Sequence, residues 1–214
     1  MDGTSPVIRA KIKVTGKNFC FNEIGQMQDG LQMIGGSLYY FDNDGYMKTG
    51  KIANVEEEND TFTYYFETKN AKNGQGVTGE KSGYLYWNGK RLEADDDYKL
   101  YKVGTEYYLV NNKGKLQKSE SKEFELENMN GETYKFKINK NSYRVTEAYK
   151  MGDNGKVEST VKPEELKAEV PVIELYDSVI TEDNAGKQVT MLADELDKFV
   201  EDGRVVKGET NKAE

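Results

Sequence analysis

A segment of the sequence repeats at a spacing of 20 residues. Residues 21–30 read Phe-Asn-Glu-Ile-Gly-Gln-Met-Gln-Asp-Gly, and residues 41–50 repeat the Phe, the Met and both Gly residues at the same places. Degenerate copies follow, marked by the aromatic pairs Tyr64 and Phe66, Tyr84 and Trp87, Tyr107 and Tyr108, and Tyr134 and Phe136. A unit this short cannot bury an apolar face by itself, so successive copies must stack on one another.

Each copy predicts a β-hairpin. An alternating aromatic strand leads into a turn rich in Asn, Asp and Gly, and a short second strand follows. The turns are expected at residues 43–45, 88–89 and 112–114. Because a lone two-stranded hairpin is marginal in water, we expect an all-β fold, a solenoid of tandem β-hairpin repeats whose stability is a sum of neighbour contacts.

The aromatic residues define how far this array extends. The chain has 15 Tyr, 8 Phe and one Trp, and all but Tyr176 and Phe199 lie between Phe19 and Tyr149. With 36% hydrophobic and 32% charged residues, the chain is lean in aliphatic residues, so its core must be built on rings. We therefore expect a leader strand over residues 1–15 and the hairpin array over residues 16–149.

Residues 150–214 differ in character and form an acidic C-terminal extension with 9 basic and 16 acidic side chains. A turn is expected at residues 152–155, a helical start at Pro163 and a strand over residues 170–176. Residues 190–200 predict a helix with Leu192, Leu196, Phe199 and Val200 on one face. This small strand and helix either caps the array or contacts a partner, and a loose acidic end follows.

Charge and composition exclude several classes of function. A net charge of −8 argues against nucleic acid as a partner. No apolar run is long enough to span a membrane, and the first residues lack the apolar centre of a signal peptide. The chain has no His and one Cys, Cys20, which lies between two Phe residues and is expected to be buried. We expect no catalytic residue, no metal and no cofactor.

Three motifs that resemble functional sites are better explained as turns or solvated loops. Residues 74–79 fit the dinucleotide-binding pattern Gly-x-Gly-x-x-Gly, but no helix is expected after them. Residues 42–45 suggest a calcium loop, yet the register would require Tyr40 as the first ligand and Lys51 as the twelfth. The acidic runs at residues 56–60 and 93–97 are typical of solvated loops.

The segment at residues 36–50, Gly-Ser-Leu-Tyr-Tyr-Phe-Asp-Asn-Asp-Gly-Tyr-Met-Lys-Thr-Gly, resembles the cell-wall-binding repeat of Gram-positive surface proteins, which includes choline-binding and glucan-binding members. With its degenerate copies the resemblance covers about residues 16–149. It implies a hairpin solenoid on the bacterial surface that holds ligands between successive hairpins. It also implies a protein that is secreted or associated with the cell wall.

This sequence departs from that family at the positions that form the aromatic cage for choline. Where the family has Trp, this chain has Leu38, Thr63, Tyr84, Glu106 and Thr133, and Lys51 and Glu80 replace the Trp that follows the turn. We therefore do not expect intact choline sites. The best remaining ligand-binding group consists of rings suited to stacking on a sugar, although the same rings could simply close the core: Tyr84, Tyr86, Trp87, Tyr107 and Tyr108.

Two functions follow from these residues, and a third stays open. The first is a non-catalytic module, not an enzyme, that binds cell-wall polysaccharide or another surface glycan, or acts as a spacer. The second is a structural or protein-interaction array that docks a partner through hairpin edges or the C-terminal helix. The third, glycan hydrolysis, would need two carboxylates about 5 to 10 Å apart in a cleft.

Overall fold

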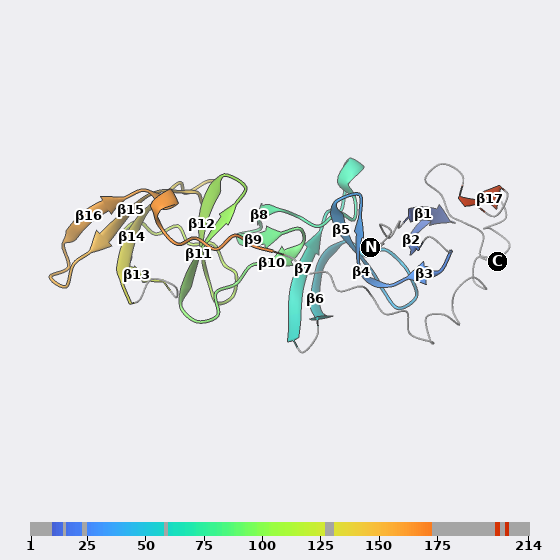
Figure 1. Cartoon of the computed structure of the whole chain (residues 1–214), viewed down its shortest axis with the longest axis horizontal. Helices are drawn as coiled ribbons and strands as arrows, with labels where there is room; N and C mark the ends of the chain where they lie inside the picture. The colour runs from blue at the N-terminus through green and yellow to red at the C-terminus, as the bar shows by residue number, and fades with distance from the viewer. Residues whose placement is uncertain are drawn as a thin grey trace, which may run out of the picture. The chain divides into compact units, whose positions relative to one another are not determined.

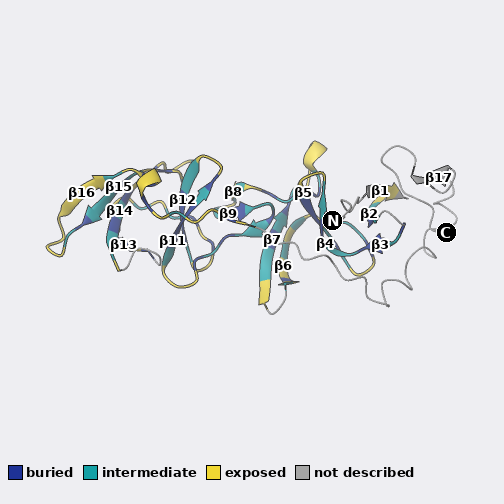
Figure 2. Ribbon diagram, in the orientation of Figure 1, coloured by how far each residue is buried: buried dark blue, intermediate teal, exposed yellow. Residues whose placement is uncertain are grey.

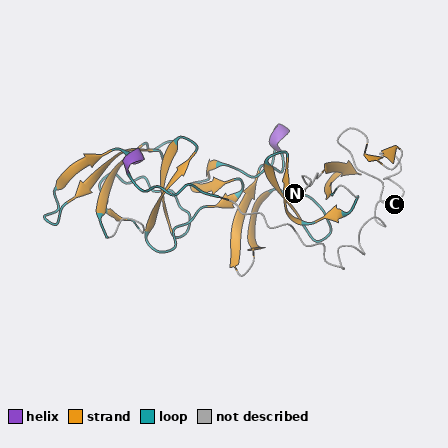
Figure 3. Ribbon diagram, viewed as in Figure 1, coloured by secondary structure: helices purple, strands orange, loops and turns teal. Residues whose placement is uncertain are grey.

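The computed structural model describes residues 10–14, 16–22, 25–57, 60–126, 131–172, 200–201 and 204–205. These residues form strands and turns together with two short 3-10 helices, η1 at Asn70–Lys72 and η2 at Pro163–Glu165 (Figures 1 and 3). The strand ladders are antiparallel. The predicted all-β fold of tandem β-hairpins is confirmed.

The chain divides into two compact units, which we describe separately. Unit 1 comprises Met1–Ile52, Phe66–Gly76 and Glu174–Glu214, and unit 2 comprises Ala53–Tyr65 and Val77–Ile173. The hairpins of unit 1 are a three-stranded sheet, a two-stranded hairpin and a short pair near the C-terminus. Their strands are β1 (Ala10–Val14), β2 (Lys17–Phe21) and β3 (Met27–Gln28), β4 (Gly30–Ile34) and β5 (Ser37–Phe41), and β17 (Val200–Glu201) and β18 (Arg204–Val205).

The core of unit 1 is built on rings and sulfur, as the composition predicts. Cys20, Tyr39 and Phe41 are buried together, and Met47 packs against them. Gly74 lets the chain pass close to this cluster, because a Cβ there would lie 2.5 Å from the Met47 sulfur. The prediction that Cys20 is buried is confirmed, since its exposed fraction is 0%.

One pattern of backbone hydrogen bonds recurs in the turns at residues 42–46, 111–115 and 152–156, and the described residues 22, 25 and 26 form the same bonds. In each, the first residue donates its N–H to the carbonyl of the fifth, and the fourth, a glycine with positive φ, donates to the carbonyl of the first. At Asp42 the side-chain Oδ1 also accepts the N–H groups of Asp44 and Tyr46, at 3.1 and 2.8 Å. These contacts confirm the turns predicted at residues 43–45, 112–114 and 152–155.

Asp42 should make the stability of unit 1 sensitive to acid. Burial alone would raise its pKa, but its bonds to Lys48 and to the turn N–H groups outweigh that effect and hold the pKa of Asp42 below its usual value. A lowered pKa contributes stability that is present above the unfolded value and is lost as pH falls through the folded one. We expect Asp42→Asn to lower the free energy of unfolding by about 1 kcal/mol at pH 7. Between pH 5 and pH 2, the free energy of unfolding of this variant should fall less than that of the wild type.

Urea unfolding followed by far-UV circular dichroism at pH 7, 4 and 2 measures this difference. Asp153→Asn, at an exposed carboxylate in another of the four turns, is the control. Equal acid sensitivity of Asp42→Asn and the wild type would contradict the prediction.

A five-stranded sheet in the order β6-β7-β10-β9-β8 lies in unit 2 except for residues 50–52 of β6 and Phe66 of β7. Its last hairpin turns at Asn88 and Gly89, whose positive φ angles of 45° and 95° fit the two-residue turn predicted there. The strands are β6 (Gly50–Glu57), β7 (Asp60–Phe66), β8 (Gly79–Lys81), β9 (Tyr84–Trp87) and β10 (Lys90–Arg91).

The rest of unit 2 holds two buried clusters of apolar side chains. One hairpin and one four-stranded sheet supply most of them: β11 (Tyr98–Val103) with β12 (Glu106–Asn111), and β13 (Phe124–Glu125), β14 (Thr133–Ile138), β15 (Val145–Met151) and β16 (Val157–Val161). Buried residues lie along β11, β12, β14 and β15, whereas β16 is mostly exposed and is drawn yellow in Figure 2. Because β15 runs through residue 149 and pairs with β16, the hairpins continue past the boundary that the sequence analysis placed at 149 and 150.

The segment after β16 returns to the sheet. Helix η2 starts at Pro163, as predicted, and Leu166 is buried. Glu169 then pairs with β11 in parallel, since its N–H donates to the Leu100 carbonyl and its carbonyl accepts from Lys102, both at 2.8 Å. Of the strand expected over residues 170–176, residues 170–172 are not in a strand and the rest lie outside the described residues. Residues 190–199 of the expected helix also lie outside them, and its last residue, Val200, is in strand β17 instead of a helix.

Candidate functional site

The five rings predicted as a ligand-binding group all lie in unit 2, but the structure does not bring them together. Trp87 and Tyr108 share one buried cluster, which also contains Leu85 and Val110. Tyr107 packs against the other cluster. A single sugar-stacking groove made of all five rings is therefore not formed.

Strand alternation explains the separation. Tyr107 and Tyr108 are neighbours on β12, and successive side chains on a strand point to opposite faces of the sheet. The same holds for Tyr86 and Trp87 on β9. Tyr86 is 2% exposed, and its ring centroid lies 5.8 Å from that of Tyr65. Burial raises the pKa of Tyr86, so this phenol stays neutral.

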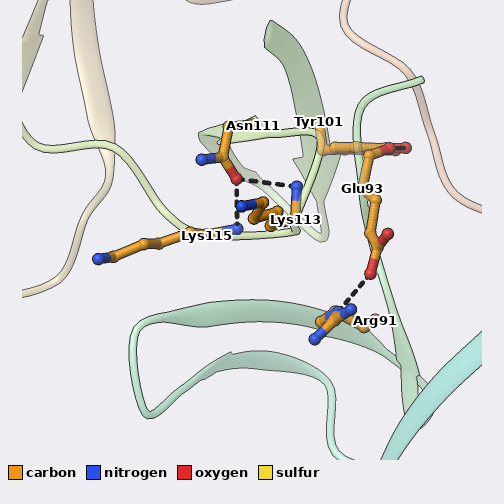
Figure 4. A network of polar contacts seen from close by, with 6 residues as sticks. All are labelled: Arg91, Glu93, Tyr101, Asn111, Lys113 and Lys115. Carbon is orange, nitrogen blue, oxygen red and sulfur yellow. Dashed lines mark hydrogen bonds and ion pairs between the residues drawn. The ribbon is translucent and has the colours of Figure 1, made fainter. Parts of the chain in front are cut away.

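Tyr84 occupies a position where the family pattern has Trp, and a cation of the chain already covers its ring. The guanidinium carbon of Arg91 lies 5.5 Å from the Tyr84 centroid, and the Arg91 Nε is bonded to Glu93 (Figure 4). The Tyr84 face therefore holds a cation–π contact within the chain.

This arrangement recurs along the chain. Eight cations of the described residues each lie within 6.0 Å of at least one ring centroid. The pairs are Lys17 with Tyr46, Lys81 with Tyr65, Lys90 with Phe62, Arg91 with Tyr84, Lys99 with Tyr101, Lys102 with Tyr107, Lys118 with Tyr143, and Lys122 with Tyr98 and Phe124. Many ring faces thus contact the chain's own ammonium groups.

A second recurring arrangement joins a glutamate to a tyrosine and a lysine. Glu57 accepts the Tyr64 hydroxyl at 2.5 Å and binds the Lys90 ammonium at 2.8 Å. Tyr64 is 0% exposed, and burial, followed by its bond to Glu57, raises its pKa. The phenol therefore stays protonated and acts as a hydrogen-bond donor to Glu57.

The same grouping appears twice in the four-stranded sheet. Glu132 bridges Tyr134 and Lys150, and Glu147 bridges Tyr149 and Lys137. The pKa of Tyr134 is raised by burial and then by Glu132. These clusters tie strands together by hydrogen bonds and fit a structural role.

The repeat region holds a smaller group of half-buried rings. Tyr46 lies 5.3 Å from Phe19, centroid to centroid, with Lys17 at 5.5 Å from the Tyr46 centroid. Tyr40 stacks on Phe66 at 6.3 Å with an interplanar angle of 23°. Tyr40 and Tyr46 keep part of their surface exposed, whereas Phe19 and Phe66 are buried beneath them. The sequence analysis did not single out these tyrosines, although both lie in the segment that carries the resemblance.

The segment that contains Tyr40 and Tyr46 is also the part of the chain that matches a known family. Residues 28–80 match the family model of the choline-binding repeat. The match confirms the predicted resemblance over these residues, and the degenerate copies after Glu80 lie outside it. It gives no support to the expectation that choline is excluded as a ligand. No curated protein sequence matches the chain.

Several solved structures are similar in part. Choline binding protein F from Streptococcus pneumoniae is 24% identical, with 65% of this chain and 40% of that chain covered and a TM-score of 0.40. CbpJ from the same species is 21% identical, with 69% and 47% covered and a TM-score of 0.41. The modular autolysin LytC, also from this species, is 14% identical, with 71% and 33% covered and a TM-score of 0.36. The chain spans less than half the length of each.

Among the described residues, no three His, Cys, Asp or Glu side chains come together as a metal site, and no helix is long and apolar enough to cross a membrane. Asp42, in the segment that suggested a calcium loop, instead bonds the turn N–H groups and Lys48.

Proposed function

We propose that this chain is a non-catalytic module that attaches a protein to a bacterial cell-wall polymer, and that the choline-binding repeats at residues 28–80 recognise the polymer. The observation that carries the proposal is the family match, which falls on consecutive antiparallel hairpins. Solved structures similar to this chain include a pneumococcal endolysin complexed with choline and choline binding protein F with a peptidoglycan analogue. A position outside the cell, at the wall, belongs to the same proposal.

The rings of the repeats suit a quaternary ammonium group. Such a group binds over aromatic faces through cation–π attraction and loses little hydration when its methyl groups are covered. Tyr40 and Tyr46 each present a half-buried ring backed by a buried Phe. The Lys17 ammonium lies 5.5 Å from the Tyr46 centroid, so a ligand at Tyr46 would compete with it. Choline is therefore the first ligand to test.

A second function, a spacer or protein-interaction array, is favoured by unit 2. There the predicted sugar-stacking rings are either buried in two cores or covered by the chain's own cations. Strand β16 lies at the end of its sheet, and Val157 on it is 54% exposed, so this edge could pair with a strand of another chain.

Affinity chromatography on a choline-derivatised resin distinguishes the two functions. We expect the wild-type chain to be retained and to elute with free choline, and we expect Tyr46→Leu or Tyr40→Leu to weaken binding by about tenfold, since each removes one cation–π face. Tyr107→Leu, in unit 2 and outside the matched residues, is the control and should elute like the wild type. A folded wild-type chain that passes through unretained would rule out choline recognition and favour the second function.

A further inference from the structure

Asn154 and Gly155 lie at the tip of the β15–β16 hairpin and form the most open of the described Asn–Gly pairs. Both residues are exposed, and no atom lies within 4 Å of the position that a Cβ on Gly155 would take. In the other two described pairs the glycine is buried. The sequence holds four such pairs, at residues 73–74, 88–89, 130–131 and 154–155, of which residue 130 lies outside the described residues.

An Asn–Gly pair places a nucleophile next to an electrophile. When the backbone nitrogen of the glycine attacks Cγ of the asparagine, the N–Cγ bond forms and the Cγ–Nδ2 bond breaks. The glycine N–H proton leaves with Nδ2 as ammonia, and a cyclic imide, a succinimide, remains. Water then opens one of the ring C–N bonds, which gives aspartate or isoaspartate without oxidation or reduction. Glycine favours the attack because it has no Cβ to obstruct the approach.

The hydrogen bonds that hold Asn154 and Gly155 lie within their own turn. The Gly155 N–H donates to the Gly152 carbonyl at 2.8 Å, and Oδ1 of Asn154 accepts the Lys156 N–H at 2.9 Å. The Gly152 N–H closes the turn by donating to the Lys156 carbonyl at 2.9 Å. Freeing the Gly155 nitrogen therefore takes only a local opening of an exposed hairpin tip, which needs much less free energy than separating strands.

The other two described pairs are bonded to neighbouring segments. The Gly89 N–H donates to the Val77 carbonyl, and the Gly89 carbonyl accepts the Tyr65 N–H, both at 2.8 Å. Gly74 is buried, and its N–H donates to the Glu67 carbonyl at 2.7 Å. Freeing either glycine nitrogen requires strands to separate or a buried cluster to unpack, so the native fold protects these two pairs.

We infer that Asn154 is a modification site, at which the chain rearranges spontaneously through a succinimide to isoaspartate while the rest of unit 2 stays folded. The inference does not rest on the proposed function, because the turn lies outside residues 28–80. Isoaspartate carries the backbone through Cβ and Cγ, so a methylene carbon is added to the turn. It also places a new negative charge beside Asp153.

The modified turn should loosen β16. A turn with a longer backbone does not keep the geometry of the bond between Gly152 and Lys156. Strand β16 is the last in its sheet and pairs with β15, and Val161 on it packs against the buried cluster that contains Leu166. Modification should therefore lower the free energy of unfolding of unit 2.

Ageing the whole chain at mildly alkaline pH tests the site, with peptide mapping by mass spectrometry and enzymatic methylation of isoaspartate as the two readouts. We expect isoaspartate to form at Asn154 at least about tenfold faster than at Asn88 or Asn73, because only Asn154 lies in a turn that opens locally. The same ageing in guanidinium chloride is the control. There the three pairs should react at similar rates, since the protection comes from the fold.

The variant Asn154→Gln tests the consequence, because the longer side chain forms the corresponding ring much more slowly. Urea unfolding should show a loss of stability on ageing in the wild type and none in Asn154→Gln. Equal rates at the three asparagines of the folded chain would overturn the inference, as would isoaspartate that forms at Asn154 only after denaturation. An equal loss of stability in the wild type and in Asn154→Gln would overturn the effect on β16.

Discussion

Replacing Gly114 by alanine should lower the free energy of unfolding of unit 2 by about 3 kcal/mol. Gly114 has a φ of +69°, a conformation that costs an L-residue about 1 kcal/mol. An added Cβ would also lie 2.7 Å from the Leu92 carbonyl oxygen and 2.8 Å from Cγ of Arg91. Because the nearest atom belongs to the backbone, relief requires the chain to move, which adds about 2 kcal/mol of overpacking.

Gly104 provides the control for this substitution. It has a φ of +64°, but no atom lies within 4 Å of the position its Cβ would take. Gly104→Ala should therefore cost about 1 kcal/mol, the backbone strain alone. Urea unfolding followed by Trp87 fluorescence measures both, since Trp87 packs on a buried cluster of unit 2. If both substitutions lower the free energy of unfolding equally, the contact between the added Cβ at Gly114 and the Leu92 carbonyl contributes nothing to the loss.

Glu57→Ala should also lower the free energy of unfolding by about 3 kcal/mol, but for a different reason. The substitution removes the carboxylate that accepts the hydroxyl of the buried Tyr64, and it removes the same carboxylate from Lys90, which is 22% exposed. A buried donor that loses its partner costs about 1 to 3 kcal/mol, and breaking a largely buried ion pair adds to that. Urea unfolding is again the measurement.

A double-mutant cycle isolates the buried hydrogen bond. Tyr64→Phe removes the donor, so Glu57→Ala should cost about 1 to 2 kcal/mol less in that background than in the wild type. Glu147→Ala is the exposed counterpart, because Glu147 and Lys137 are 41% and 55% exposed, and it should lower the free energy of unfolding much less than Glu57→Ala does. Additive costs in the cycle would mean that Glu57 and Tyr64 do not act together.

The hairpins could be predicted because their signals are local. Asn, Asp and Gly at the turns of residues 42–46, 111–115 and 152–156 form the same hydrogen bonds each time, and one turn contains all the residues that determine it. The alternation of side chains between the two faces of a strand is equally local, because it depends only on neighbouring residues. Applied to Tyr107 and Tyr108, it would have shown from the sequence that two adjacent rings cannot line one groove.

Other features depend on contacts between distant residues and were not predictable in this way. Several cations that cover rings, such as Lys118 over Tyr143 and Lys90 over Phe62, lie far from those rings in sequence, so their contacts depend on how strands and loops pack. One pocket of unit 2 is lined by Phe62, Arg91, Lys99 and Glu169 among others, residues that no sequence pattern connects. The extent of the sheet past residue 149 was missed because β16 contains no aromatic residue, and aromatic content was the criterion for the array.

The parallel pairing of Glu169 with β11 affects how unit 2 would respond to a mechanical load. When the two ends of an antiparallel hairpin are pulled apart, its hydrogen bonds are loaded one after another and the strands unzip. Pulling on the N-terminal end of one parallel strand and the C-terminal end of its neighbour loads the bonds simultaneously, in shear. The two bonds of Glu169 to Leu100 and Lys102 would therefore resist such a force together.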